Sequence, residues 1–98
     1  MTDLEMTRLC AEAMGIKVDM HPIRGSIMRY WFMDANVERE YGPLHDDAQA
    51  MALVKKFPIQ TMQALDFYEF SHRYDAEVDL NHAIVECVAK MQSAKVTA

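Results

Sequence analysis

The first fourteen residues place their apolar side chains on one side of a helix. These side chains recur three and four positions apart, at Met6, Leu9, Cys10, Ala13 and Met14. This spacing is typical of an amphipathic helix. Thr2 and Glu5 form a capping-box pattern at its start, and Gly15 is the kind of residue that follows a helix. The pattern therefore predicts a helix that begins after Thr2 and ends at Gly15.

After this helix the period of the apolar positions changes to two. Apolar and polar side chains alternate over residues 16–20, as in a strand with one buried face, and we expect His21 and Pro22 to end it. Residues 27–33 are rich in aromatic side chains and predict a second strand, paired with the first as an antiparallel hairpin. Residues 34–43 are polar and rich in turn-forming residues, so we interpret them as a loop.

Two further helices are predicted in the second half of the chain. Asp46 can cap the first of them, with Gln49 three residues on, and Pro58 is expected to end it. Residues 59–74 lack a clean period and are interpreted as two short strands. The last helix has a continuous apolar stripe, at Leu80, Ala83, Ile84, Cys87, Val88 and Met91. A frayed tail is expected over residues 93–98.

The predicted order of elements is helix, two strands, helix, two strands, helix. This order predicts the α+β class, with an antiparallel sheet layered between helices as in an α/β/α sandwich. At 98 residues the chain has room for one small domain, which we place over residues 1–98 with an ordered core over residues 2–92. No apolar run approaches the roughly 20 residues that cross a bilayer, and the first residues do not resemble a signal peptide. We therefore expect a cytoplasmic protein with no membrane partner.

Three segments resemble the sequence of a known family. Residues 9–15 resemble an opening helix that ends in Ala-x-Gly. Residues 41–51 resemble a central motif that consists of an aromatic residue, Pro-Leu, two acids and the start of a helix. Residues 80–85 resemble a closing helix in which Arg-Ala-Ile is common. Together these segments resemble the phage ABA sandwich family, although His45 stands where that family usually has a hydroxyl residue. The resemblance implies helix, sheet and helix layers and a phage or prophage accessory protein, and it implies no catalytic residues.

The net charge narrows the choice of partner. The chain has 15 Asp and Glu against 10 Lys and Arg, a formal net charge of −5. An acidic surface disfavours direct contact with nucleic-acid phosphates. Two interpretations stay open: the carboxylates stand in for phosphates in a partner's nucleic-acid groove, or they keep the protein soluble.

Two clusters of metal-capable side chains have simpler explanations as helix starts. The consecutive His, Asp and Asp at residues 45–47 include imidazole and carboxylate groups that bind divalent metals, but the two acids also suit the start of a helix. Asp79 and His82 lie three residues apart, with His72 as a third candidate, and this spacing does not identify a metal site. We therefore expect no bound metal.

No sequence motif in the chain points to catalysis. There is no nucleophile motif and no phosphate-binding loop. Cys10 and Cys87 lie on apolar stripes and are expected to be free, reduced core residues. We expect a protein that is not an enzyme and has no catalytic residue and no cofactor.

The leading hypothesis is a non-enzymatic phage or prophage accessory protein that binds a host or phage protein. Its most concrete form is an inhibitor of a host defence complex, of the anti-CRISPR type, in which acids act as phosphate surrogates beside apolar anchors. The candidate partner-binding residues are Glu38, Glu40, Tyr41, Asp46, Asp47, Met51 and Trp31. A small structural phage protein that forms homo-oligomers is the alternative, and a small metal-dependent enzyme is a further one. The aromatic strand that contains Trp31 is interpreted as core rather than as a platform for stacking bases.

Overall fold

The first helix follows its sequence pattern. The computed structural model describes residues 1–23, 27–63, 66 and 80–97, and its first element is α1 (Asp3–Met14). The Thr2 hydroxyl accepts a hydrogen bond from the Glu5 amide at 3.1 Å, and the Glu5 carboxylate accepts one from the Thr2 amide at 3.3 Å. Gly15 follows the helix in the left-handed region, with φ of 72°, where a side chain would add strain. The predicted capping box and terminal glycine are confirmed.

A three-stranded antiparallel sheet follows α1. It consists of β1 (Asp19–Ile23), β2 (Ile27–Asp34) and β3 (Val37–Tyr41), with β2 in the centre. The predicted hairpin is confirmed, but β1 begins later than predicted and continues through His21 and Pro22, so the prediction that these residues end the strand was wrong. A proline is tolerated in this position because β1 is an edge strand, where a missing N–H need not break the ladder between strands.

The interpretation of residues 34–43 as a loop was wrong, because they contain the third strand. Asp34 pairs with Val37 across a two-residue turn, and Ala35 and Asn36 have φ of 50° and 69°. Positive φ at both central residues is the geometry of a tight hairpin whose twist matches that of its strands. Asn adopts this conformation readily, but Ala does not, so the turn has a weak signature in the sequence.

The second helix, α2 (Asp47–Lys56), begins as predicted and is followed by more helix. The Asp46 side chain accepts a hydrogen bond from the Gln49 amide at 3.1 Å, which confirms the predicted cap. The helix ends at Phe57, and residues 58–63 are again helical. The strand predicted there was wrong over residues 59–63, since Pro58 stands at the first position of a helical segment, where its missing N–H costs nothing. The second predicted strand begins at Asp66, which is helical, and the rest of it falls outside the described residues.

The last helix, α4 (Leu80–Thr97), carries the predicted apolar stripe and is longer than predicted. It runs through residues 93–97, so the frayed tail expected from residue 93 was wrong over that stretch. The stripe packs against α1, and Cys10 donates a hydrogen bond from its thiol to the carbonyl of Val85 at 3.4 Å. The buried residues of this helix are Ile84, Val85, Val88 and Ala89. Only Ile84 and Val88 of the predicted stripe are fully buried, and the prediction of Cys87 as a core residue was wrong, since it is only partly buried.

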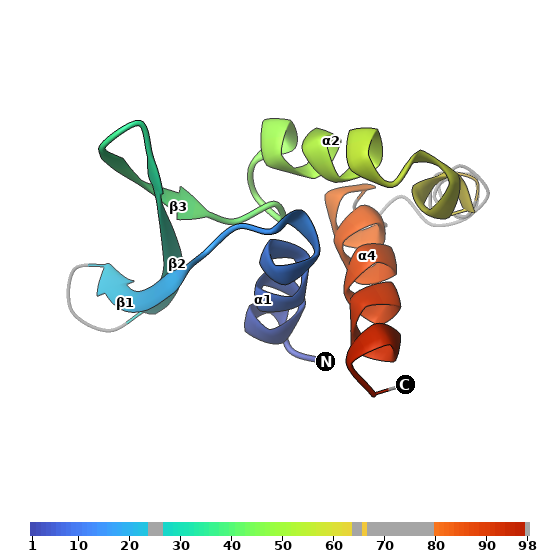
Figure 1. Cartoon of the computed structure of the whole chain (residues 1–98), viewed down its shortest axis with the longest axis horizontal. Coiled ribbons are helices and arrows are strands. Elements are labelled where there is room, and N and C mark those ends of the chain that lie inside the picture. Colours follow the sequence, from blue (N-terminus) through green and yellow to red (C-terminus); the bar gives the residue numbers. More distant parts are fainter. Residues whose placement is uncertain (24–26, 64–65, 67–79, 98) are drawn as a thin grey trace.

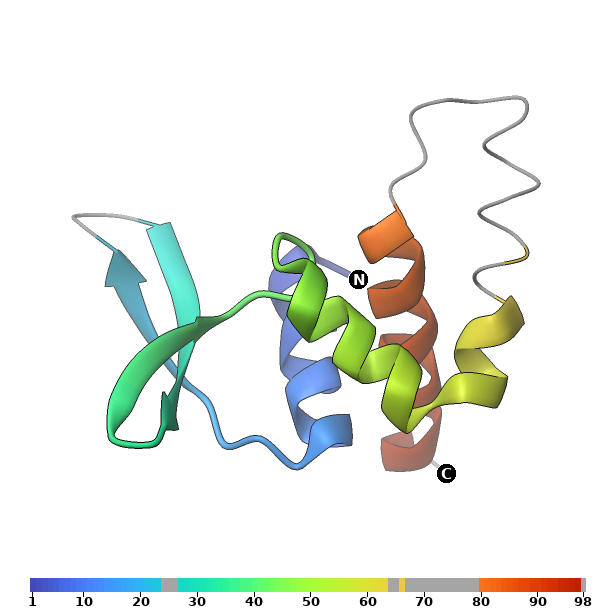
Figure 2. The same cartoon turned by 90° about the horizontal axis from the view of Figure 1, so that it is seen from above.

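The helices form one body, and the sheet projects from it. In Figures 1 and 2, α1 and α4 lie side by side, α2 crosses them, and the three strands extend to the other side of α1. The sheet meets α1 through β2. The predicted α+β class is confirmed. The described helices lie to one side of the sheet (Figure 2) and do not cover both faces as a sandwich would. Among the described helices, none is both long and apolar enough to cross a membrane.

Candidate functional site on the sheet

The two faces of the sheet differ in burial. Successive side chains of a strand point to opposite faces, so Tyr30 and Phe32 share the inner face with Tyr41, the partner of Tyr30 on β3. Tyr30 and Tyr41 are only 7% and 3% exposed, and the rings of Phe32 and Tyr41 meet edge to face at 6.0 Å. Near Tyr30 and Tyr41 the inner face therefore belongs to the core, whereas the outer face, which carries Trp31, is left partly exposed.

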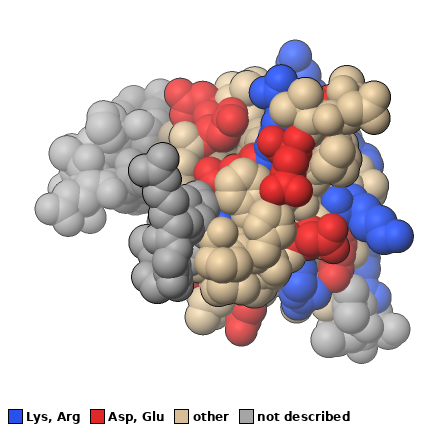
Figure 3. Space-filling view, turned by 90° about the vertical axis from the view of Figure 1, so that its left-hand side faces the viewer, with Lys and Arg blue, Asp and Glu red and all other residues tan. Residues whose placement is uncertain are grey.

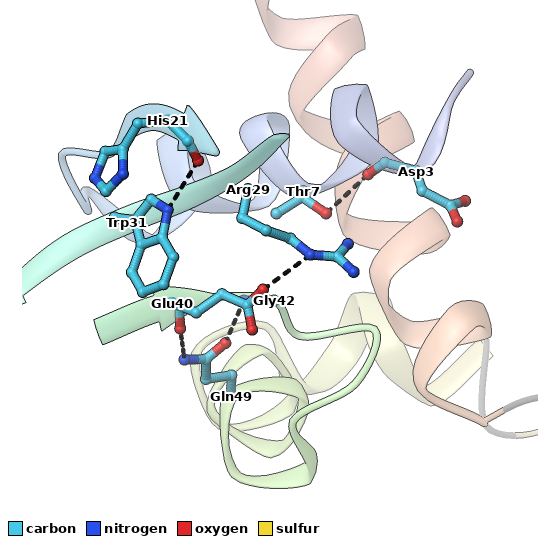
Figure 4. A network of polar contacts seen from close by, with 8 residues as sticks. All are labelled: Asp3, Thr7, His21, Arg29, Trp31, Glu40, Gly42 and Gln49. Carbon is cyan, nitrogen blue, oxygen red and sulfur yellow. Dashed lines mark hydrogen bonds and ion pairs between the residues drawn. The ribbon is translucent and has the colours of Figure 1, made fainter. Parts of the chain in front are cut away.

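Trp31 occupies the middle of the outer face and is held by contacts with two neighbouring strands. The imidazole of His21, from β1, stacks on the indole ring at 5.1 Å with an interplanar angle of 8°. The Trp31 indole N–H donates to the His21 carbonyl at 3.0 Å, as Figure 4 shows. From β3, Glu38 Oε1 lies 3.1 Å from His21 Nε2. These contacts fix Trp31 in one orientation, with its ring only partly buried.

The charged side chains of the sheet are mostly paired. Arg29 Nε lies 3.1 Å from Glu40 Oε1, and Arg39 Nε lies 3.0 Å from Asp34 Oδ2. The strands carry four acidic side chains against two arginines, so pairing leaves a modest acidic excess. In Figure 3, which looks at this side of the molecule, acidic and basic side chains are interleaved with uncharged surface. The sheet does not present a continuous acidic field.

The four acids predicted as phosphate surrogates fall into two structural settings. Glu38 and Glu40 lie two residues apart on β3 and flank the outer face around Trp31. Asp46 caps α2, and the carboxylate of Asp47 accepts a hydrogen bond from the Asn81 side chain at 2.8 Å, which joins α2 to α4. All four carboxylates therefore already have partners within the protein.

The three predicted apolar contacts have different exposures. Tyr41 is 3% exposed, so its prediction as an exposed anchor was wrong: β3 turns this residue inward against the core. Burial also raises the pKa of the Tyr41 hydroxyl above its ordinary value, with a smaller contribution from Cys10. Met51 is 46% exposed, but it lies on α2 and not on the sheet. Only Trp31 combines partial exposure with a place on the outer face.

Sequence reasoning did not find the second role of Gln49. Its side-chain oxygen accepts a hydrogen bond from the Gly42 amide at 2.7 Å, and its side-chain nitrogen donates to the Glu40 carbonyl at 2.9 Å (Figure 4). The side-chain amide of Gln49 thus forms the hydrogen bonds to the backbone at the end of β3 that a neighbouring strand would otherwise form. No local signal could have revealed this contact, because it depends on the position of a strand that the sequence pattern did not predict.

A cleft of about 300 Å³ lies where the first turn of α1 faces the end of the sheet. Its apolar walls come from Leu4, Met28, Tyr30 and Leu44. Polar side chains, among them Arg29 and His45, line the remainder. A second depression, of about 540 Å³, lies beside Trp31 and includes Asp19, Met33 and Glu38 in its lining.

Among the described residues, the two groups with the largest pKa shifts, Cys10 and Tyr41, lie in the core. Burial raises the pKa of the Cys10 thiol to about 12, with a smaller contribution from Cys87. Both cysteines are free. Within the described ranges, no group of three or more metal-capable side chains comes together. The predicted partner of His82, Asp79, lies outside the described residues, and His82 Nδ1 lies 3.5 Å from Glu86 Oε2.

Comparisons with family models, curated proteins and solved structures found no match for this chain. The resemblance to the phage ABA sandwich family therefore stays a prediction from the sequence.

Proposed function

We propose that this protein is a non-catalytic binding module that recognises a protein partner through the outer face of its sheet. The observation that carries the proposal is the position of Trp31. This large aromatic side chain is fixed by a stacked ring and a hydrogen bond on a face that none of the described helices covers. Tryptophan is enriched among the residues that dominate binding energy at protein interfaces. A pre-ordered side chain also loses little conformational entropy on binding.

The surroundings of Trp31 indicate the chemistry of the partner. Exposed Met33 provides apolar area beside Trp31, and the carboxylates of Glu38 and Asp19 belong to residues that line the second depression. The acidic excess of the strands complements a basic surface. The proposed partner is therefore a protein that places an apolar contact on Trp31 and basic side chains around it.

The geometry favours this proposal over nucleic-acid mimicry. Phosphate surrogates act best as an array of unpaired carboxylates, whereas the predicted surrogates Glu38, Glu40, Asp46 and Asp47 each have a partner within the chain. Inhibition of a host defence complex rests on the family resemblance, and we retain it only as one setting in which a partner-binding module would act.

The ionisation pattern supports a binding role over a catalytic one. Catalytic groups are typically tuned toward reactive states inside accessible clefts. Here burial instead holds Cys10 and Tyr41 in their neutral forms within the core. The perturbed groups therefore act as packing residues.

Self-association is the second candidate, because methionines at the β1–β2 hairpin are exposed. Met20 pairs with Tyr30, and Met28 lies two residues before Tyr30 on the same face. Both methionines are about two-fifths exposed (44% and 38%). Methionine suits adaptable interfaces. Light scattering on the purified protein distinguishes the two candidates, since a partner-binding module can be a monomer and a self-associating protein cannot.

The test compares two exposed apolar residues on different elements. Wild-type protein, Trp31→Ala and Met51→Ala are immobilised separately, and nuclease-treated lysate of the source cell is passed over each. We expect one protein retained in stoichiometric amount by wild type and by Met51→Ala but not by Trp31→Ala. Equal retention by all three variants, or loss with Met51→Ala alone, would contradict the proposal. Circular dichroism of each variant verifies that it is folded.

A further inference from the structure

The guanidinium group of Arg29 lines the cleft between α1 and the sheet and forms an ion pair through its Nε. Arg29 lines this cleft together with Leu4, Met28, Tyr30 and Leu44. Its side chain is 36% exposed and is therefore accessible to solvent. An accessible cationic group beside apolar walls is the usual arrangement of a small-ligand site.

A chain of polar contacts fixes the orientation of Arg29. Its Nε lies 3.1 Å from the Glu40 carboxylate. The Glu40 carbonyl accepts from the Gln49 side chain, which in turn accepts from the Gly42 amide. Figure 4 shows this network, with α2 anchoring the end of β3 and β3 anchoring the arginine. The network thus holds the backbone of Glu40 in place, and the Glu40 carboxylate gives Arg29 a partner on one side.

The two terminal nitrogens of Arg29 are the unused part of this network. In Figure 4 they point away from Trp31, toward α1. Among the described residues, Glu40 is the ion-pair partner of Arg29, and the contact between them is at Nε. Two parallel N–H donors match the two oxygens of a carboxylate, and the resulting charge-assisted pair is stronger where water is partly excluded.

The other charged groups of the cleft leave this position open to an anion. Glu40 contacts Arg29 at Nε, and in Figure 4 the terminal nitrogens point away from Glu40. The carboxylate of Asp3 is directed away from Arg29 in Figure 4. His45, which also lines the cleft, can donate a further hydrogen bond.

We propose that this cleft binds a carboxylate carried on a small apolar group. The carboxylate pairs with the terminal nitrogens of Arg29, and the apolar group packs on Leu4, Met28 and Leu44. Arg29 lies two residues before Trp31 on β2, but the lining of the cleft does not include Trp31, so the two assignments are tested by different variants. The same chemistry is found in a free aryl or acyl carboxylic acid and in the last residue of a polypeptide.

The test is a ¹H–¹⁵N NMR titration of the full chain with 4-phenylbutyrate and with its uncharged amide. We expect the acid, and not the amide, to shift the backbone signals of the cleft, including those of Leu4, Met28 and Leu44. Arg29→Met should weaken binding about tenfold or more, because it removes a charge-assisted pair. The control is Arg39→Met, since Arg39 also forms an ion pair within the sheet but lies outside the cleft. Its affinity should stay within about twofold of wild type.

Two further arms identify the source of the carboxylate and guard against misfolding. A short peptide ending in Phe with a free carboxylate, compared with the same peptide amidated, tests a polypeptide end. Binding of 4-phenylbutyrate or of the peptide with a free carboxylate supports the site. The probe that binds more tightly identifies the source of the carboxylate. Arg29→Lys keeps the charge and loses the paired donors, so it should bind more weakly than wild type even if Arg29→Met does not fold. Equal binding of acid and amide, equal loss in the Arg29 and Arg39 variants, or no shift in the cleft would overturn the proposal.

Discussion

The helical body and the sheet are stabilised by different interactions. In the helical body, Leu53, Val85 and Val88 are completely buried, and α1, α2 and α4 share one apolar core. On the outer face of the sheet, side chains are partly exposed and are held by a stacked ring, one hydrogen bond and ion pairs. Exposed ion pairs contribute little stability. The contrast indicates that the helices supply the stability of the fold and that the outer face is free to serve recognition.

The largest expected effect is in the helical core. Leu53→Ala removes a side chain that is 0% exposed and should lower the free energy of unfolding by about 2–5 kcal/mol. Met33→Ala, at a residue 65% exposed on the sheet, should change it by less than about 0.5 kcal/mol. Urea titrations of both variants give these values. Similar losses in the free energy of unfolding would contradict the view that the helical body, and not the outer face of the sheet, stabilises the fold.

Trp31→Ala should separate affinity from stability. Because Trp31 is pre-ordered on the outer face, its removal should weaken partner binding by about 2 kcal/mol or more. The same change should destabilise the fold by less than Leu53→Ala does, since the indole is only partly buried. Calorimetric titration against the retained partner and urea unfolding measure the two quantities. A stability loss equal to that of Leu53→Ala would place Trp31 with the core.

Alkaline pH should destabilise the core through its buried thiol. Burial raises the pKa of Cys10 from 9.0 to about 12 in the folded chain, so the unfolded chain loses its proton first as pH rises. The stabilisation is complete below about pH 9 and is lost between about pH 9 and 12. The free energy of unfolding should fall by about 1 kcal/mol between pH 8 and 10. Tyr41 contributes in the same direction at higher pH.

The control for this pH effect is Cys10→Ala. This variant removes the buried thiol, so the fall in stability between pH 8 and 10 should be clearly smaller than in wild type. Cys87 stays in both proteins and is less buried. Urea midpoints at the two pH values decide the matter, and an equal fall in both proteins would rule out Cys10 as the cause.

A smaller effect is expected at the start of α2. Asp46→Ala removes a cap that accepts from the Gln49 amide and should cost about 1 kcal/mol. Asp47→Ala removes an exposed contact with Asn81 and should cost about half as much. Both changes should leave partner binding unchanged, because neither residue lies on the outer face. Weaker binding in either variant would extend the recognition surface to α2 and revive the predicted role of these acids.

The helices could be predicted from the sequence because their signals are local. The stripe of α1, its cap at Thr2 and its end at Gly15 all lie within one segment, and the same holds for the cap at Asp46. β3 could not be predicted, because polar Glu38, Arg39 and Glu40 hide its alternation. Residues 58–63 were misinterpreted because proline both ends helices and begins them.

The candidate site was predictable only in part. An aromatic strand around Trp31 is visible in the sequence, but its clamp joins His21 and Glu38 from two other strands. These contacts depend on the register of the strands, and a one-residue shift in register would abolish them. The burial of Tyr41 depends on the same register. The pairing of the strands therefore decides which of the predicted site residues are exposed.

The most direct test of the central claim is hydroxyl-radical footprinting of the protein with and without its retained partner. Met33 and Met51 are matched probes, since both are exposed and readily oxidised, and they lie on β2 and α2. We predict that the partner protects Met33 and Trp31 from oxidation and leaves Met51 as reactive as in the free protein. Protection of Met51 with unchanged oxidation of Met33 and Trp31 would contradict the assignment of recognition to the outer face of the sheet.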